Sequence, residues 1–477
     1  MKYETVVGLE IHAELSTKTK IYCSCENSFG GSENTRCCPV CIGLPGTLPT
    51  LNKKVVEYGI KAGLAMNCEI AEYSKQDRKN YFYPDLPKAY QISQFDFPLC
   101  EHGFVIIDTE NGQKKIGITR IHIEEDAGKF THDPYRNLSR VDYNRGGVPL
   151  IEIVSEPDIR SSAEANAFLE AVRSILKCIG VSDCKMQEGS LRCDVNVSVR
   201  PEGQKEFGVR SECKNVNSFS GAVRAIDYER ARQIEILESG AEVEQETRRW
   251  DDMAGKSFLL RSKEEAHDYR YFPEPDLMPM EISRGWVEEI RESLPELPHE
   301  KKARFMAEYG LPEYDSGLIS VSDGFSKLLD DTVGCGAAPK EASNWILGEI
   351  SKEINERCIT SDDVPFGGQA LAELIALINK GTISGSIAKQ IVPDMFESDK
   401  SPEEIVKAKG LLQISDEGEI AKIIKEVFEA NPKAIEDYKG GKTNVRGFLT
   451  GQVMRATKGK ANPAVINKQL EIELGKL

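Results

Sequence analysis

Two absences bear on where this chain works. The sequence has no apolar run long enough to cross a bilayer. Its N-terminus reaches Glu10 before any long apolar stretch, which argues against a secretory signal. We therefore expect a cytoplasmic protein with no membrane partner.

Standard nucleotide-binding and hydrolase motifs are missing as well. Gly255-Lys256-Ser257 looks like the end of a P-loop, but Trp250 stands where the first glycine belongs, and Gly441-Lys442-Thr443 fails in the same way at Glu436. No GxGxxG opens a helix after a strand, and there is neither a G-x-S-x-G elbow nor a glycine- and serine-rich amidase signature. A self-contained hydrolase is thus disfavoured. If the chain uses ATP, metals and basic residues on a sheet must hold the phosphates.

The overall composition is that of a globular protein. Hydrophobic residues make up 40% and charged residues 29% of the chain, a balance that disordered chains do not have. With 477 residues, about two to four domains are expected. The net charge of -16 argues against a protein coated in nucleic acid, although it leaves room for a local basic surface.

Five of the thirteen cysteines fall between Cys23 and Cys41. In a reducing compartment this clustering favours metal binding over disulfides. Cys23, Cys25, Cys38 and Cys41 form two closely spaced pairs, which could supply the four thiolates of a closed, structural Zn²⁺ site. Cys37 is a spare that could replace Cys38. The alternative is that these residues are ordinary free cysteines.

The first part of the chain reads as α+β. In 5–15 and again in 191–200, apolar residues alternate with polar ones, which is typical of antiparallel strands with one covered face. Helical periods interrupt the strands at 163–179 and 222–239.

The character of the sequence changes near Pro298. Helical periods dominate beyond it, for example at 340–354, 369–380 and 384–392, and no strand pattern follows. Ser401-Pro402-Glu403-Glu404 combines a capping serine, a proline at the first helical position and a glutamate three residues after the cap, so a further helix should begin there.

These changes predict three domains. The first, 1–293, is an α+β domain built on antiparallel strands. It is followed by an all-helical domain at 294–400 and a helical tail domain at 401–477.

The tail carries a charge asymmetry that the acidic total conceals. From 438 to 470 there is no Asp or Glu, while the basic residues are Lys439, Lys442, Arg446, Arg455, Lys458, Lys460 and Lys468. Glycines between them would let a backbone approach phosphates. By itself, a short basic cluster fits a solvated surface as well as it fits an RNA-binding one.

Glu10 and His12 lie two residues apart, so they share the polar face of the strand predicted at 5–15. A carboxylate and an imidazole together suit a divalent cation, but magnesium needs more oxygen ligands. Candidates lie in 121–126 and 150–154. The plain alternative is an ordinary solvent-exposed strand face.

Several longer strings are too specific to be a matter of composition. They lie at 7–12, 77–85, 87–94, 124–129, 149–158, 189–194, 245–249, 268–276, 451–454 and 458–463. Together they closely resemble the B-subunit family of the tRNA-dependent amidotransferases, and the resemblance covers essentially the whole chain.

The resemblance implies a cradle-shaped catalytic domain related to the glutamine synthetase fold, followed by a helical domain and a helical tail. It also implies a heterotrimer with an amidase A subunit, which hydrolyses glutamine and passes on ammonia, and a small C subunit. This chain would use ATP to phosphorylate the side-chain carboxylate of Glu-tRNA(Gln) or Asp-tRNA(Asn). Ammonia would then displace phosphate to give Gln-tRNA(Gln) or Asn-tRNA(Asn).

The resemblance also assigns roles to individual residues. His12, Glu125 and Glu152 would bind Mg²⁺, with Glu10 nearby. Arg192 and Asp194 are expected to meet the phosphate and to support the metal ligands. The basic tail would grip tRNA, and the cysteine site would be a structural feature of one subgroup of the family.

One of these assignments conflicts with the strand pattern. Strict alternation places Glu124, and not Glu125, on the face of His122. We follow the resemblance here, because Asp126-Ala127-Gly128 suggests that the strand ends or bulges at this point.

Three other functions fit the sequence less well. A tRNA-binding accessory protein without catalysis would have no use for His12, Glu125 and Glu152. The B-type subunit of a two-subunit, glutamate-only enzyme carries an inserted domain for which this chain has no room. A free-standing glutamine-synthetase-like ligase would leave the basic tail without a purpose. Whether the substrate is Glu-tRNA(Gln), Asp-tRNA(Asn) or both depends on the host.

Overall fold

A computed structural model describes residues 2–133, 135–262, 268–411, 417–439, 445–457 and 463–476. The chain forms two compact units, Met1–Leu297 and Pro298–Leu477. The first combines a large sheet with helices, and the described part of the second is helical, which confirms the expected α+β class with a helical C-terminal region. Within the described ranges, every helix is too short or too polar to span a bilayer.

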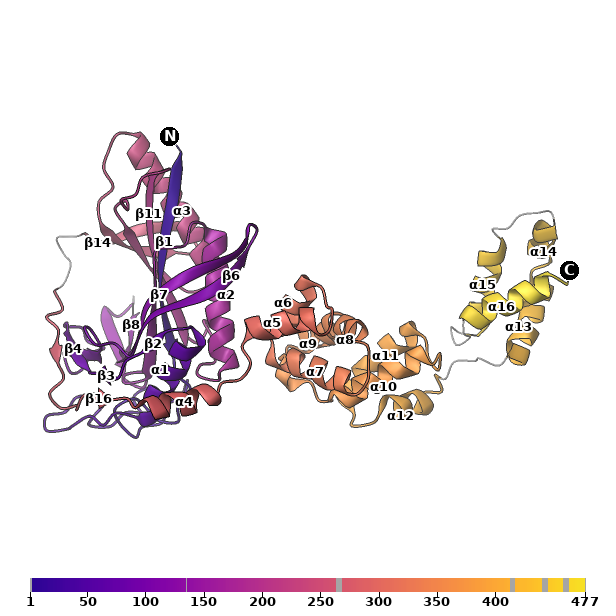
Figure 1. Ribbon diagram of the computed structural model, residues 1–477, viewed down its shortest axis with the longest axis horizontal. Coiled ribbons are helices and arrows are strands. Elements are labelled where there is room, and N and C mark those ends of the chain that lie inside the picture. The colour runs from indigo at the N-terminus through magenta and orange to yellow at the C-terminus, as the bar shows by residue number, and fades with distance from the viewer. Residues whose placement is uncertain are drawn as a thin grey trace. The chain divides into compact units, whose positions relative to one another are not determined.

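A nine-stranded sheet forms the centre of the first unit (Figure 1). Its strands, from one edge to the other, are β14 (Lys256–Ser262), β13 (Glu246–Asp251), β12 (Ser211–Val216), β11 (Leu191–Pro201), β1 (Tyr3–Glu14), β10 (Pro149–Ser155), β7 (Gly112–Glu125), β6 (Cys100–Thr109) and β2 (Glu69–Ile70). Neighbouring strands run antiparallel, except that β12 and β13 are parallel.

One face of this sheet is apolar and buried. The inward residues of β1 that the alternation predicted, Val7, Leu9, Ile11 and Ala13, are all at most 1% exposed. Helices α1 (Lys53–Ala65), α2 (Ser162–Cys178) and α3 (Phe219–Glu238) contact its strands and cover this face. The alternation in the sequence therefore identified which side of the sheet is left for polar chemistry.

The two predicted helices of this unit are confirmed within a few residues. Ser161 caps α2 by accepting a hydrogen bond from the Glu164 amide, and Ser218 caps α3 in the same way at Gly221. Phe168 of α2 is fully buried in the core beneath the sheet.

Short elements complete the first unit. They are β3 (Tyr73–Ser74), β4 (Asp77–Asn80), β5 (Tyr90–Ser93), β8 (Lys129–Asp133), β9 (Leu138–Asp142), β15 (Phe272–Pro273), β16 (Met280–Glu281) and α4 (Arg284–Glu292). A three-stranded sheet, in the order β15-β4-β5, contacts β7 through β5. It brings polar residues from another part of the chain to the end of β7.

The described elements of the second unit are helices. They are α5 (Pro298–Ala307), α6 (Glu313–Ser320), α7 (Asp323–Gly334), α8 (Pro339–Trp345), the π-helix η2 (Ile346–Ile350), α9 (Ser351–Arg357), the 3₁₀-helix η3 (Ser361–Asp363), α10 (Gly368–Asn379), α11 (Gly385–Glu397), α12 (Pro402–Ala408), α13 (Glu417–Ala430), α14 (Pro432–Lys439), α15 (Val445–Ala456) and α16 (Pro463–Leu474). The helices predicted at 340–354 and 369–380 are confirmed. The one predicted at 384–392 continues through Pro393 to Glu397, and Met395 beyond that proline is buried in the core.

Two separate apolar cores lie in this unit. One gathers residues from Phe305 to Val406, with Leu411 packed against it, and the other gathers residues from Ile420 to Leu474. The capping box at Ser401 is present and starts α12. Ile405 and Val406 of α12 belong to the first of these cores. The domain boundaries at 293 and 400 stay a prediction.

Candidate active site

The strand register sets four polar residues in one row across the sheet. His122 in β7 pairs with Glu152 in β10, Glu152 pairs with His12 in β1, and His12 pairs with Arg192 in β11. Paired residues of neighbouring strands point to the same side. The row therefore lies on the face opposite to α1, α2 and α3.

His12, Glu124 and Glu152 form a compact group. One ligand atom from each lies within 4.8 Å of the other two. His12 Nε2 is 3.3 Å from Glu152 Oε2 and 3.8 Å from Glu124 Oε1. His122 joins the group, with its Nε2 3.5 Å from Glu152 Oε2. Two carboxylates and an imidazole are a donor set that suits a divalent cation.

The charged side chains of this group shift one another's pKa values. Burial would lower the pKa of His12, but the hydrogen bond and charge of Glu152 raise it to about 9. Burial would raise the pKa of Glu152, yet the neighbouring His122 and His12 imidazoles bring it below its usual range. Both Glu152 and Glu124 thus stay ionised although they are buried. A cluster of buried carboxylates of this kind is a typical place for a bound cation.

Glu124, and not Glu125, stands beside His12 and Glu152. The pairing of β7 with β10 runs without interruption through Glu124 and Glu125, and its only irregularity lies at Val154 and Ser155. The strand was expected to end or bulge here: β7 does end at Glu125, but its alternation holds up to that last residue. The Glu125 carboxylate therefore points away from His12 and Glu152, and its role as a magnesium ligand stays a prediction.

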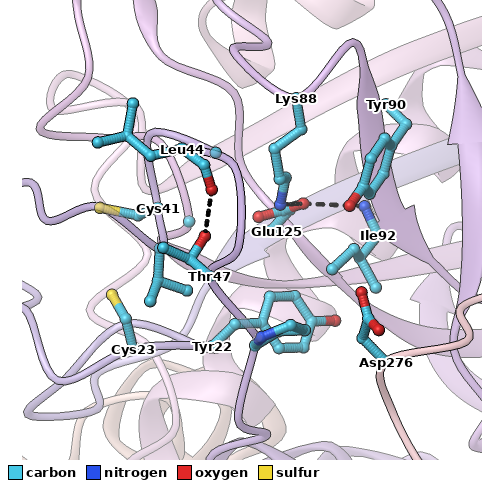
Figure 2. A pocket seen from close by; sticks show the side chains of 14 residues that line it. Tyr22, Cys23, Cys41, Leu44, Thr47, Lys88, Tyr90, Ile92, Glu125 and Asp276 are labelled. Atoms are coloured by element: carbon cyan, nitrogen blue, oxygen red, sulfur yellow. Dashed lines mark hydrogen bonds and ion pairs between the residues drawn. The ribbon is translucent and has the colours of Figure 1, made fainter.

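The Glu125 carboxylate faces a different part of the molecule. It accepts hydrogen bonds from Lys88 Nζ and, over 2.9 Å, from the Ile92 amide. These groups lie in a cavity of about 130 Å³, which Figure 2 shows. Cys23 and Cys41 line the same cavity, so Glu125 shares it with two members of the cysteine cluster.

Glu10 belongs to a second acidic group on the same face of the sheet. Ligand atoms of Glu10, Asp194 and Glu212 lie within 4.8 Å of one another. Lys214 Nζ contacts Asp194 Oδ2 over 2.7 Å and Glu212 Oε1 over 2.8 Å. Burial, followed by the charge of Glu152, raises the pKa of Glu10. Glu10 therefore lies in a second group that is close to Glu152, and its role as a magnesium ligand stays a prediction.

Arg192 lies at the end of the central row. Its Nη2 donates to Asp126 Oδ2 over 2.6 Å, and Arg145 Nε lies 3.4 Å from the same oxygen. Arg192 Nε is buried without a hydrogen-bond partner among the described residues. This unused donor could donate a hydrogen bond to an oxygen of a phosphate or carboxylate ligand.

Lys79 is a site residue that the sequence analysis did not select. Burial would lower its pKa, but the charge of Glu124 raises it above the usual value. Its Nζ lies 5.0 Å from the centroid of the Tyr269 ring. Lys79 stands in a string quoted for the family resemblance, yet four residues of β4 are too few for a periodic pattern to single it out.

The four predicted cysteines do come together. The sulfur atoms of Cys23, Cys25, Cys38 and Cys41 lie within 4.8 Å of one another, and those of Cys25 and Cys41 are 4.0 Å apart. In a tetrahedral tetrathiolate zinc site the sulfurs are about 3.8 Å apart. The Cys38 amide donates to Cys41 Sγ over 3.1 Å, while Cys37 Sγ donates to the Asn34 carbonyl instead. The cluster therefore uses Cys38 and leaves Cys37 aside.

The structure describes only part of the predicted basic tail. Lys442, Lys458 and Lys460 lie outside the described residues, and Lys439 is the last residue of α14. Two further members lie in α15. Arg446 Nη2 is 3.1 Å from Glu471 Oε1, and Arg455 is exposed.

Comparison with known proteins adds independent findings. Residues 5–288 match the family described as the GatB/GatE catalytic domain, and residues 327–474 match the family described as the GatB domain. A protein of Caldicellulosiruptor saccharolyticus, named as the B subunit of aspartyl/glutamyl-tRNA(Asn/Gln) amidotransferase, is 58% identical over 480 residues, covering 100% of both chains. Proteins of the same name from Thermoanaerobacter pseudethanolicus and Clostridium botulinum (strain Okra) are 58% and 55% identical, again over 100% of both chains.

Proposed function

Because the chain belongs to the B-subunit family of the aspartyl/glutamyl-tRNA(Asn/Gln) amidotransferases, we propose that it activates the side-chain carboxylate of Glu-tRNA(Gln) or Asp-tRNA(Asn) with ATP. Its family makes it a subunit of a tRNA amidotransferase, a ligase-type enzyme that uses glutamine. The acyl-phosphate route, the ATP requirement and the individual roles below are part of the proposal.

The proposed reaction has two balanced steps. In the first, a carboxylate oxygen attacks the γ-phosphorus of ATP, so that an acyl phosphate forms and ADP leaves. In the second, ammonia attacks the acyl carbon, phosphate leaves, and the nitrogen loses a proton to give the amide. A free carboxylate cannot follow this route because its leaving group would be oxide. Since the first step brings two anions together, the site must supply positive charge.

The observation that carries the proposal is the group of His12, Glu124 and Glu152 on the polar face of the sheet. These residues fit a divalent cation, because the buried carboxylates stay ionised and a bound cation would displace the proton for which Glu152 raises the pKa of His12 to about 9. Mg²⁺ held there would neutralise phosphate charge. Glu125, which the family resemblance indicated, remains a second candidate for the third ligand.

Basic residues around this group would act on the substrates directly. The Lys79 ammonium and the unused Arg192 Nε donor could each meet a phosphate oxygen. Asp194 is held by Lys214, so its proposed part is to support the row from the neighbouring strand. This arrangement would replace a P-loop, which the sequence lacks.

The cysteine cluster is proposed to hold a structural Zn²⁺. Its sulfur separations and the amide of Cys38 pointing at Cys41 Sγ agree with a tetrathiolate centre. With four protein ligands, the centre would have no open position for water. Its proposed part is to stabilise the loop between β1 and α1.

The remaining proposals concern fold relationship and partners. The mostly antiparallel sheet, with helices on one face and polar residues on the other, supports a relation to the glutamine synthetase fold. An amidase A subunit would supply ammonia, a small C subunit would complete a heterotrimer, and the tail with Arg446 and Arg455 would bind tRNA. A tRNA substrate implies that the complex works in the cytoplasm.

The test is ATP-dependent conversion of Glu-tRNA(Gln) to Gln-tRNA(Gln) by the assembled complex, with ammonium chloride as the nitrogen source. We expect His12→Ala to lower the rate at least about 100-fold, since a group that acts on the reacting charge is lost. The variant should still bind tRNA. His299→Ala, an exposed histidine of α5, is the matched control and should convert normally. Normal conversion by His12→Ala would show that the reaction does not take place on this face of the sheet.

A further inference from the structure

Lys20 is a buried lysine beside the cysteine cluster. Its side chain is fully buried, although it belongs to a loop beside the cysteine cluster. Nζ donates to the Gly146 carbonyl over 2.7 Å and to the Tyr143 carbonyl over 3.2 Å. In the described part of the chain, Lys20 forms no ion pair with Asp or Glu. Burying an unpaired charge costs several kcal/mol, so a compensating negative charge is expected nearby.

The nearest source of that charge is sulfur. Lys20 Nζ lies 3.8 Å from Cys41 Sγ, a member of the cluster. Four thiolates around one Zn²⁺ carry a net charge of about -2, which a low-dielectric site must offset. The ammonium and the tetrathiolate therefore satisfy each other's need for an opposite charge.

The same lysine links the two halves of the cluster. Its amide donates to the Cys25 carbonyl over 3.0 Å, which closes the loop that carries Cys23 and Cys25. Its side chain reaches Cys41 in the second pair. Lys20 is thus in contact with both cysteine pairs, through its backbone and its side chain respectively.

The carbonyls that Lys20 binds belong to a turn next to the active-site face. In this turn, Arg145 donates to the carbonyls of Ala127 and Gly128, and the Gly147 amide donates to the Asp126 carbonyl over 2.9 Å. A Cβ added at Gly147 would lie 3.5 Å from Cys41 Cβ and 4.0 Å from Glu125 Oε2. The turn therefore fills the space between the cluster and the end of β7.

We propose that Lys20 is a positioning residue for the metal centre: it offsets the charge of the tetrathiolate and connects the centre to the turn at 143–147. This inference rests on the proposed Zn²⁺ site and goes beyond it. Its consequence is that metal occupancy controls the order of the turn beneath Glu125 and Asp126.

The first test compares Lys20→Met with Lys18→Met in the full-length chain. Lys18 is exposed and two residues away, so it controls for loss of a lysine from the same loop. We expect Lys20→Met to release zinc to a chromogenic chelator roughly 10- to 100-fold faster than the wild type, since metal affinity typically falls by this factor when residues behind metal ligands are removed. Lys18→Met should match the wild type.

Cobalt substitution separates an electrostatic role from a merely structural one. A cation beside a thiolate stabilises its lone pairs, so Lys20→Met should move the thiolate-to-cobalt absorption to longer wavelength. Unchanged absorption together with unchanged zinc release would overturn the inference while leaving the zinc site intact. A wild-type chain that binds no zinc would overturn the proposed site itself.

A second measurement needs no variant, in case Lys20→Met does not fold. Hydrogen exchange of the wild-type chain is compared with zinc bound and after zinc removal. The amides of Gly146, Gly147 and Val148 should exchange at least about tenfold faster without zinc, because the turn loses its link through Lys20. Equal exchange in both states would contradict the proposed connection.

Discussion

At the scale of single residues, the adjacent side chains of Glu124 and Glu125 lie in two different environments. Glu124 lies beside His12 and His122, whereas Glu125 accepts from Lys88 and the Ile92 amide. Two neighbouring carboxylates of equal length thus offer a direct comparison. Only one of them is placed to share a cation with His12.

We predict that Glu124→Gln lowers ammonium-dependent conversion at least about 100-fold, because it removes a charged ligand candidate. Glu125→Gln should reduce it by a smaller factor, since the amide oxygen can still accept from Ile92. The two variants are compared in the same assembled complex, with zinc content and tRNA affinity measured alongside. A greater loss in Glu125→Gln would favour the ligand set that the family resemblance indicated.

The sequence predicted part of this site for a clear physical reason. His12 and Arg192 lie on long strands whose apolar residues alternate without a break, so their face could be read from the pattern. Glu125 was placed beside His12 because a family motif was followed, whereas the alternation of β7 continues to its last residue and turns Glu124 to that face. Lys79 and Glu212 were missed because β4 and β12 are short, and their polar faces are closed by residues distant in the sequence.

At the scale of elements, α3 contains a buried glutamate that its sequence pattern does not reveal. Glu229 stands in the middle of this helix and is fully buried. Its carboxylate lies 2.8 Å from Arg232 Nη2 and 3.2 Å from Arg248 Nε, and it accepts from Ser257 Oγ. The helix is therefore tied to β13 and β14 by a charged network. A helical period cannot reveal such a network, because its partners lie on other elements.

We predict that Glu229→Ala lowers the free energy of unfolding of the first unit by about 3 kcal/mol, since it removes the buried carboxylate that Arg232 and Arg248 share. The two half-buried guanidinium groups would then have Glu246 as their common carboxylate partner. The measurement is the urea midpoint followed by circular dichroism. Glu235→Ala, at an exposed position of the same helix, is the control and should change the midpoint little. Similar midpoints for both variants would mean that the network contributes nothing to holding α3.

At the scale of the whole molecule, the start of the helix at Ser401 does not coincide with the boundary between two apolar cores. The serine and proline at 401 and 402 mark where a helix starts, and the structure contains that helix. They do not mark where an apolar core ends. Ile405 and Val406 pack with the core that begins at Phe305, whereas the last core begins at Ile420. Local capping chemistry is readable from sequence, but the choice between two cores depends on contacts across the chain.

This packing sharpens the test of the tail. A chain ending after Leu411 keeps Ile405 and Val406 in their core, so it should fold. We expect its tRNA affinity to fall at least about tenfold, because the phosphate contacts of the tail are missing. Glutamine hydrolysis by the amidase partner should stay unchanged. A chain ending after Lys400 should also lose about 3 kcal/mol of stability, because each buried apolar side chain contributes roughly 1.5–3 kcal/mol. Filter binding of tRNA, glutaminase assays and thermal unfolding separate these effects. Parallel loss of tRNA binding and glutamine hydrolysis in the chain ending at Leu411 would show that the tail serves assembly and does not serve tRNA recognition.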